Sequence, residues 1–443
     1  MTRETWLIRG GTVVTMDPAR TVRRADVLVR DGRIERVGRL RPPEGAAVLD
    51  ATDAAVMPGL VQSHVHLCQS LFRGMAEDLP LLRWLRARIW PLEAAHDGRS
   101  LYASARLGLA AMMRAGTTAV LDMGTVHDHD AVFEAMRDAG VRGLSGKAMM
   151  DRGRGCPARL RESTRESLTQ SERLRARWHG AGEGRLGYAY APRFVLSCSA
   201  SLLEQTAEAA RHHGLLVHSH VAEHASERAA VRRARGAEDL AVLERHGVCG
   251  PRAVLAHGVQ LGAGELRRAA ALGTRLVHCP SANLKLASGI APLRAMRRAG
   301  VRVGLGADGA PCNDRMDLWT EMRLAALLAK VQAADPAAVS AADVLAMATC
   351  EGAAVLGLDG EIGSVEPGKR ADLLVVRLDA LGAAPRADVV TQLVYATTPA
   401  DVRHVLIDGA LRVRDHALVG VDEETIRREA ERAARRVRAR AGV

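Results

Sequence analysis

Residues 57–74, MPGLVQSHVHLCQSLFRG, decide the fold. Residues 56–61 are apolar apart from Pro58 and Gly59, so this segment can enter the core as a buried strand. The strand then delivers His64 and His66. Side chains at positions i and i+2 of a strand point to the same face, so both imidazoles can reach one metal ion. A lone His-x-His pair also fits a structural or surface role. Other residues of the chain are needed to decide between that role and metal binding.

The middle of the chain, residues 58–358, alternates apolar β-rich runs with helical patterns. Eight strands and eight helices over about 300 residues match the count and size of a (β/α)₈ TIM-type barrel. A doubly wound open sheet is the alternative, but no Gly-rich phosphate loop follows any of the strands. The predicted strands are 56–63, 117–123, 141–149, 185–191, 214–221, 252–257, 273–278 and 301–307. The predicted helices are 81–93, 99–115, 129–139, 201–213, 225–246, 264–272, 291–299 and 315–331.

Both termini read as short strands. Residues 6–56 hold several β-rich runs separated by turn signals, but a segment of about 55 residues is too short for a robust core of its own. The far end supplies further strand candidates at 373–376, 389–394, 405–407 and 411–413. We therefore predict a composite β-sandwich domain from residues 1–57 and 359–443, with a charged helix over 422–441. The barrel, residues 58–358, is inserted between its halves.

Candidate metal ligands lie at the ends of the predicted barrel strands, which is where barrel active sites are found. His64 and His66 follow the first strand, His220 ends the fifth and Asp308 follows the eighth. Alone, His220 would suit a protein core and Asp308 a helix cap. Their coincidence at strand ends favours one site for a divalent ion, with zinc the first choice and iron the alternative.

The same strand ends supply groups for hydrolysis. A bound divalent ion lowers the pKa of water and so provides a nucleophile near neutral pH. Glu223, three residues after His220, is the best candidate general acid and base. His257, at the end of the sixth strand, can orient the attacking oxygen, and Asp308 can accept the proton of the water.

Taken together, several segments resemble the amidohydrolase superfamily, and within it the one-metal deaminases of 5′-deoxyadenosine, methylthioadenosine and S-adenosylhomocysteine. The resemblance covers nearly the whole chain. It implies hydrolytic loss of ammonia from C6 of an adenine-type nucleoside, which gives the inosine analogue. The segments are MPGLVQSHVHLCQ at 57–69, residues 78–85, residues 89–93, HVAE at 220–223, residues 278–292 and GADGAPCN at 306–313.

The resemblance also assigns site residues. It implies metal ligands at His64, His66, His220 and Asp308, with Glu223 and His257 as above. It implies that Trp84 lines the nucleoside pocket and that Glu93 binds the ribose hydroxyls. Dinuclear relatives use a carboxylated Lys at the end of strand four; residues 185–191 contain no Lys, which favours one metal ion.

Two positions depart from this pattern. Where the methylthioadenosine group has Gly-Pro-His after strand four, this chain has Ala191-Pro192-Arg193, and Gln69 follows His66 by three residues. Gln69 and Arg193 resemble guanine deaminases, in which a Gln and an Arg read the purine edge. A guanine or pterin deaminase, or an s-triazine amino- or chlorohydrolase, therefore stays open. Arg152, after strand three, is a candidate contact to the outer part of the substrate, or else a surface loop residue.

The composition limits the kinds of partner that we expect the protein to bind. The net charge is +11, but only four Lys occur, the Arg residues are scattered and no basic run carries interleaved aromatic residues, so we predict no nucleic-acid binding. Neither a signal-peptide core nor an 18-residue apolar span occurs, which predicts a cytoplasmic protein without a membrane partner. Seven Cys without a C-x-x-C pair predict free thiols. The expected partners are a small heterocyclic substrate and, from the family resemblance, further copies of the chain.

Overall fold

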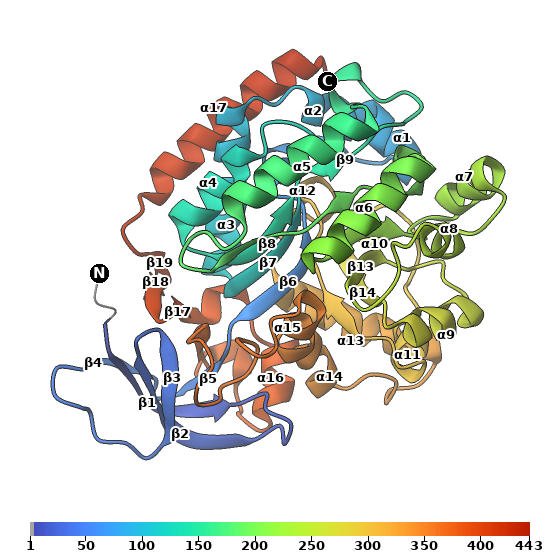
Figure 1. The fold of residues 1–443 in the computed structure, drawn as a ribbon. Coiled ribbons are helices and arrows are strands. Elements are labelled where there is room, and N and C mark those ends of the chain that lie inside the picture. The colour runs from blue at the N-terminus through green and yellow to red at the C-terminus, as the bar shows by residue number, and fades with distance from the viewer. Residues whose placement is uncertain (1–3) are drawn as a thin grey trace.

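Eight parallel strand positions form a closed ring in the computed structural model, which describes residues 4–443 (Figure 1). The first three residues of the predicted N-terminal segment lie outside this range. Neighbouring strands pair in chain order, and isolated bridges complete the ring between Tyr190 and Val217 and between Val65 and Asp308. The strands are β6 (Leu60–Val65), β7 (Thr117–Met123), β8 (Arg142–Gly146) continued by β9 (Ala148–Met149), β10 (Leu186–Tyr188) continued by β11 (Ala191–Pro192), β12 (Val217–Val221), β13 (Ala253–His257), β14 (Arg275–His278) and β15 (Val303–Leu305). The (β/α)₈ barrel is confirmed.

Helices surround this ring and connect its strands. The longer ones are α3 (Gly98–Arg114), α4 (Asp130–Ala139), α5 (Thr164–Trp178), α6 (Ala200–His213), α7 (Ala225–Arg235), α8 (Asp239–Arg245), α9 (Ala263–Leu272), α13 (Leu318–Ala333), α14 (Ala341–Met347), α15 (Cys350–Leu356), α16 (Val389–Tyr395) and α17 (Glu423–Ala441). The shorter ones are η1 (Leu67–Phe72), α1 (Leu81–Trp84), η2 (Leu85–Ile89), α2 (Trp90–Ala94), η3 (Ala158–Leu160), η4 (Val195–Ser197), α10 (Pro280–Lys285), α11 (Leu293–Arg298), α12 (Ala310–Asn313), η5 (Leu381–Ala383) and η6 (Pro399–Asp401).

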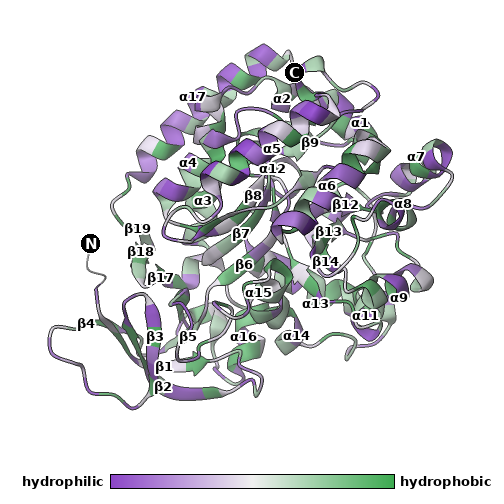
Figure 2. Ribbon diagram, viewed as in Figure 1, coloured by the Kyte–Doolittle hydropathy of each residue, from purple (hydrophilic) through white to green (hydrophobic). Residues whose placement is uncertain are grey.

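The hydropathy of the elements agrees with their places inside or outside the barrel. Strand β7 is largely hydrophobic, whereas α17 on the outside is strongly hydrophilic (Figure 2). α17 nevertheless buries Ile426, Ala430 and Val437 against its neighbours. Within residues 4–443, no helix has the length and apolar character needed to cross a membrane.

A separate sheet is built from both ends of the chain, as predicted. Its central strand β5 pairs in parallel with β1 on one side and antiparallel with β16 on the other. The strands are β1 (Trp6–Val14), β2 (Val22–Arg30), β3 (Arg33–Gly38), β4 (Ala47–Asp50), β5 (Ala54–Pro58), β16 (Leu373–Arg377), β17 (Val402–Ile407), β18 (Ala410–Arg414) and β19 (Ala417–Leu418). They pair as one sheet of nine strands. The predicted domain limits and the sandwich arrangement stay predictions.

Two of the contacts that join the sheet to the barrel lie close to the start of β6. Only Gly59 separates β5 from β6, and a Cβ atom at this position would lie 2.0 Å from Oγ1 of Thr118, so no side chain fits. Nearby, Nε of Arg142 at the start of β8 donates to Oδ2 of Asp372 at 2.8 Å, and both side chains are buried. The strand that carries His64 is therefore held at its start by the terminal sheet.

Three local predictions differ from the structure. Residues 389–394, expected as a strand, form α16, because Asp388 accepts a hydrogen bond from the Thr391 N–H and packing against α13 and α14 overrides the β-propensity of the valines. The helix expected over 225–246 is two helices, since Gly236 ends α7 with φ of 66°. Helix α5 was not predicted, although Ser163 and Glu166 form a capping box at its start.

The predicted helix 81–93 is continuous but contains a π turn, η2. The Trp90 N–H donates to the carbonyl of Leu85, five residues back. Pro91 has no N–H to bond the carbonyl of Ala87 four residues back, so the α-helical ladder is interrupted here. A π turn adds one residue and changes which side chains share a face. As a result Trp84 and Glu93 are both buried.

Candidate metal centre and active site

Four candidate ligands converge where β6, β12 and β15 end. Oδ1 of Asp308 lies 3.4 Å from Nε2 of His64 and 3.3 Å from Nε2 of His66. Nε2 of His220 lies 3.3 Å from Nε2 of His66. A tetrahedral ion with bonds of about 2.0–2.1 Å holds neighbouring ligand atoms about 3.3–3.4 Å apart. The four predicted residues therefore fit one divalent ion.

Hydrogen bonds set two imidazoles of this cluster, those of His66 and His220, in the tautomer that a metal requires. Nδ1 of His66 donates to the carbonyl of Met123 at 2.7 Å, and Nδ1 of His220 donates to the carbonyl of Arg193 at 2.7 Å. A carbonyl can only accept, so the proton is on Nδ1 and the lone pair is on Nε2. Burial lowers the pKa of His66 to about 4, so its ring is neutral at pH 7.

Glu223 and His257 lie beside the candidate ligands. Nε2 of His257 is 3.5 Å from Oε2 of Glu223 and 3.8 Å from Oδ2 of Asp308. Burial raises the pKa of Glu223 well above its usual range, and the charge of Asp308 acts in the same direction. Oε1 of Glu223 and Nε2 of His257 are buried and have no hydrogen-bond partner among residues 4–443, as suits groups that meet a substrate.

The backbone is strained at these positions. Ala222, His257 and Asp308 have φ of 47°, 78° and 63°, values that non-glycine residues seldom adopt. Such conformations persist where the surrounding structure imposes them, and they cluster at functional sites. Close packing contributes here, since a Cβ atom at Gly306 would lie 2.6 Å from the carbonyl oxygen of His64.

A pocket opens next to this cluster. Leu81, Trp84, Leu85, Phe194 and Leu286 form its apolar part, while Gln69, Arg193, Glu223 and Glu227 are polar. Nε1 of Trp84 donates to the carbonyl of Ala76 at 3.0 Å, which fixes the indole. The cavity volume is about 30 Å³, room for about two waters.

Three predicted substrate-binding residues form one buried network. Nη1 and Nη2 of Arg193 donate to the two carboxylate oxygens of Glu93 at 2.5 and 3.0 Å, and Nε2 of Gln69 donates to Glu93 at 2.8 Å. Burial opposes the charge of Glu93, but the charge and hydrogen bonds of Arg193 lower the pKa of this carboxyl below its usual value. The network forms the polar end of the site.

Arg152 is placed differently from the other candidates. Its side chain is exposed and is not among those that line the pocket. Its backbone N–H donates to the carbonyl of Ser197 at 3.1 Å.

Sequence reasoning missed two residues that support the site. Asn283 accepts the Nδ1–H of His257 at 3.0 Å and thereby leaves Nε2 of His257 free as an acceptor. Glu227 accepts the backbone N–H of Glu223 at 2.9 Å and is buried at the pocket. A Glu at the third position of α7 is a recognisable capping signal, and Asn283 lies within the motif at 278–292.

The fold and the cluster define a class of protein, the barrel hydrolases that act through a bound divalent ion. The chain belongs to the amidohydrolase family, whose profile, described as "Amidohydrolase family", matches residues 55–412.

Relatives of known name cover nearly the full length. The chain is 39% identical to a 5′-deoxyadenosine deaminase of Methanothermobacter thermautotrophicus, over 98% of this chain and 99% of that one. It is 38% identical to a 5-methylthioadenosine/S-adenosylhomocysteine deaminase of Haloarcula marismortui, with the same coverage. Among solved structures, an adenosine deaminase of Xanthomonas campestris with bound zinc superposes with a TM-score of 0.92 at 34% identity, over 99% of both chains.

Proposed function

We propose that the protein is a metal-dependent deaminase that converts an adenine-type nucleoside to the inosine analogue and ammonia. The substrate class is 5′-deoxyadenosine, methylthioadenosine, S-adenosylhomocysteine or adenosine. The observation that carries the proposal is a buried Glu223, 3.5 Å from His257, held beside a cluster of three imidazoles and one carboxylate. The deaminases that share 38–39% of their residues with this chain support it.

His64, His66, His220 and Asp308 would hold the ion, for which we propose zinc, as in the Xanthomonas relative; iron is the alternative. When bound, such an ion lowers the pKa of water and supplies a nucleophile near neutral pH. The neutral imidazoles with free Nε2 atoms suit this role, because protonated rings would not bind a cation.

The protons are handled by the protein's own carboxyl groups. As water adds to C6 of the purine, Asp308 accepts its proton at the oxygen that faces His257. Glu223 gives its proton to the amino group, which leaves as ammonia, and the proton taken up by Asp308 then restores Glu223, so both carboxyls return to their starting states. His257, with Nε2 unprotonated, accepts a hydrogen bond from the attacking water and so orients it.

The remaining pocket residues would position the nucleoside. The Trp84 indole offers an apolar wall for a flat purine ring. We assign Glu93 to the ribose hydroxyls and Arg193 with Gln69 to the purine edge, and we assign Arg152 to the outer part of the substrate. Because Arg193 and Gln69 both bond Glu93 in the closed pocket, these bonds rearrange when a ligand enters.

A second candidate function is deamination of guanine or a pterin, or amino- or chloride-group hydrolysis of an s-triazine. The observation that favours it is that Gln69 and Arg193 both line the pocket and present amide and guanidinium groups to a ring edge.

The test is product release from a panel of substrates. The zinc-loaded protein is assayed for ammonia with the four adenine nucleosides, guanine and an aminotriazine, and for chloride with a chlorotriazine, with chelated protein as control. Turnover of the adenine nucleosides that is lost on chelation supports the proposal. Turnover of guanine or a triazine alone supports the second candidate, and turnover of any substrate by chelated protein contradicts the role of the metal.

We also propose that the chain forms a homo-oligomer, works in the cytoplasm and does not bind nucleic acid. All seven cysteines are free thiols, which suits a reducing compartment. Light scattering after gel filtration measures the assembly, and retention on DNA at physiological salt with a steep salt dependence would contradict the last point.

A further inference from the structure

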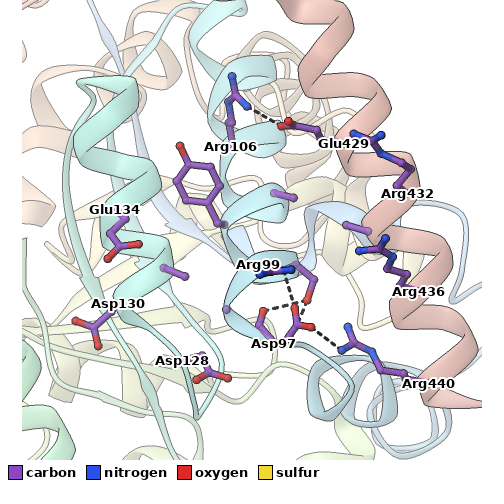
Figure 3. A pocket seen from close by; sticks show the side chains of 16 residues that line it. Asp97, Arg99, Arg106, Asp128, Asp130, Glu134, Glu429, Arg432, Arg436 and Arg440 are labelled. Carbon is purple, nitrogen blue, oxygen red and sulfur yellow. Dashed lines mark hydrogen bonds and ion pairs between the residues drawn. The ribbon is translucent and has the colours of Figure 1, made fainter.

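A second cavity lies on the outside of the barrel, bordered by α3, α4 and α17 (Figure 3). Its volume is about 920 Å³, within the range of small-molecule sites, which is about 300–1,000 Å³. None of its lining residues lines the substrate pocket. We call it the outer cleft. One side carries Asp130 and Glu134 of α4, and the other carries Arg432 and Arg436 of α17.

Every carboxylate that lines the outer cleft already has a cationic partner. Two of these partners belong to the cleft and three come from outside it, so the acidic side is neutralised without a ligand. The pairs and their N–O distances are Asp97–Arg440 at 2.7 Å, Glu429–Arg106 at 2.7 Å, Asp130–Arg173 at 2.6 Å, Asp128–Arg159 at 3.4 Å and Glu134–Arg177 at 3.8 Å.

Three of the arginines that line the outer cleft take no part in these ion pairs. Arg99, Arg432 and Arg436 have no ion pair or side-chain hydrogen bond with any of residues 4–443. Arg432 and Arg436 are one helical turn apart on α17 and both reach toward α3 (Figure 3). Like charges at this spacing repel each other, and no carboxylate of the cleft is left to compensate them. The unpaired charge of the outer cleft is therefore positive and concentrated on the side of α17.

We propose that the outer cleft binds a small ligand through a polyphosphate group, as in inorganic pyrophosphate or a nucleoside di- or triphosphate. Guanidinium groups are planar forks of donors that match phosphate oxygens in pairs, and three of them suit two or more phosphate groups. A nucleic-acid strand fits less well, because its backbone would continue past α17 to the carboxylates of Asp128, Asp130 and Glu134.

The test is isothermal titration calorimetry with the full-length, zinc-loaded protein at physiological salt, using pyrophosphate and ATP as separate probes. The cleft variant is Arg432→Gln/Arg436→Gln. The matched control is Arg435→Gln/Arg438→Gln, which removes the same charge from the same helix at exposed positions outside the cleft lining. Pyrophosphate can also extract zinc from a protein, but that reaction would be equal in the two variants.

We expect the wild type and the control variant to bind, and the cleft variant to bind at least about tenfold more weakly, since charged hydrogen bonds are lost. Similar affinity for both probes identifies the polyphosphate group as the feature recognised. Tighter binding of ATP than of pyrophosphate identifies nucleotides as the class of ligand that the outer cleft prefers.

The proposal is overturned if neither probe binds at millimolar concentration, or if the cleft and control variants lose affinity equally. Binding of a 20-nucleotide DNA strand in the absence of any binding by the small anions would also overturn it. The thermal melt and ammonia release of each variant show that it is folded. The titration contains no substrate, so its result does not depend on the proposed deamination.

Discussion

At the scale of single residues, Glu223 is the group that would make this site catalytic as well as metal-binding. The cluster of three imidazoles and Asp308 is sufficient to hold an ion, but the amino group of a substrate needs a proton in order to leave. Burial raises the pKa of Glu223 and so favours the protonated form of this carboxyl. The role of this residue is thus separable from the role of the ligands.

We expect Glu223→Gln to lower kcat by about 10²–10⁴-fold, the usual contribution of a general acid and base. Glutamine has the size of the protonated carboxyl and no proton to give, so metal content and melting temperature should stay close to those of the wild type. Steady-state kinetics and metal analysis of the purified variant check this. The exposed Glu208→Gln serves as control, and wild-type turnover by Glu223→Gln would contradict the proposed proton transfer.

A second buried carboxyl, Glu321, should make stability depend on pH. Burial raises its pKa to about 7, against an ordinary value of 4.5. Between pH 4.5 and 7 the unfolded chain loses this proton while the folded chain keeps it, so stability falls as pH rises. Over this window the wild type should lose about 3 kcal/mol relative to Glu321→Gln, which cannot titrate.

Urea unfolding at pH 5 and pH 8 measures this difference. Glu208→Gln should follow the wild type at both pH values, because its side chain is exposed. Parallel pH dependences of the wild type and Glu321→Gln would show that Glu321 has an ordinary pKa.

Much of the site is visible in the sequence at this scale, and the reason is chemical. Imidazole and carboxylate side chains are rare at strand ends unless they act there, so His64, His66, His220 and Asp308 can be identified together. The partners that set the imidazole tautomers cannot be identified from the sequence. Those of His66 and His220 are the backbone carbonyls of Met123 and Arg193, and every residue has a carbonyl.

At the scale of elements, the segment α1–η2–α2 connects the apolar wall of the pocket to its polar end. The π turn orients Trp84 and Glu93 into the interior together. A hydrophobic pattern predicts this helix but not the extra residue, because an apolar periodicity of 3.6 tolerates one irregular turn. The prediction for the valine-rich run at 389–394 is wrong for a different reason. Its pattern favours a strand, whereas its cap and its packing produce a helix.

We expect deletion of Ala87 and Arg88 to replace the π turn by a regular α-helical turn that is one residue short, because the π turn itself adds only one residue. The residues beyond it would rotate by about 100° relative to Trp84, which takes Glu93 away from Arg193. Displacements of this kind near a substrate commonly cost about 10²-fold in rate, so kcat/KM should fall by at least that factor.

Ala87→Ser, which keeps the chain length, is the matched control and should retain wild-type kinetics. Circular dichroism confirms that both variants are folded. If the deletion keeps kcat and KM, the π turn does not position the pocket residues.

At the scale of the whole molecule, the barrel and the terminal sheet share a buried ion pair. Arg142 of β8 bonds Asp372, and Oδ1 of Asp372 also accepts the backbone N–H of Asp408 at 2.7 Å. Because this contact belongs to both units, we expect them to unfold in one transition.

Asp372→Asn should lower the free energy of unfolding by about 3 kcal/mol, because it leaves the Arg142 guanidinium buried without its main partner while keeping the acceptor for Asp408. Denaturant titration followed by fluorescence and circular dichroism measures this. The double variant Arg142→Met/Asp372→Asn should recover most of the loss, since no unpaired charge stays buried. Two separate transitions in the wild type would contradict the shared unfolding.

The central place of β5 in the terminal sheet has a consequence for how the protein is made. Pro58 is the last residue of β5, and Leu373 is the first residue of β16. The ribosome therefore synthesises Leu373 315 residues after Pro58 (373 − 58 = 315). At about 5–20 residues per second, this interval is on the order of 15–60 s. During that time β5, whose five residues are all buried in the finished fold, has one bare edge. The nascent chain thus carries an aggregation-prone strand until β16 has been synthesised, and the strand bearing His64 is anchored only then.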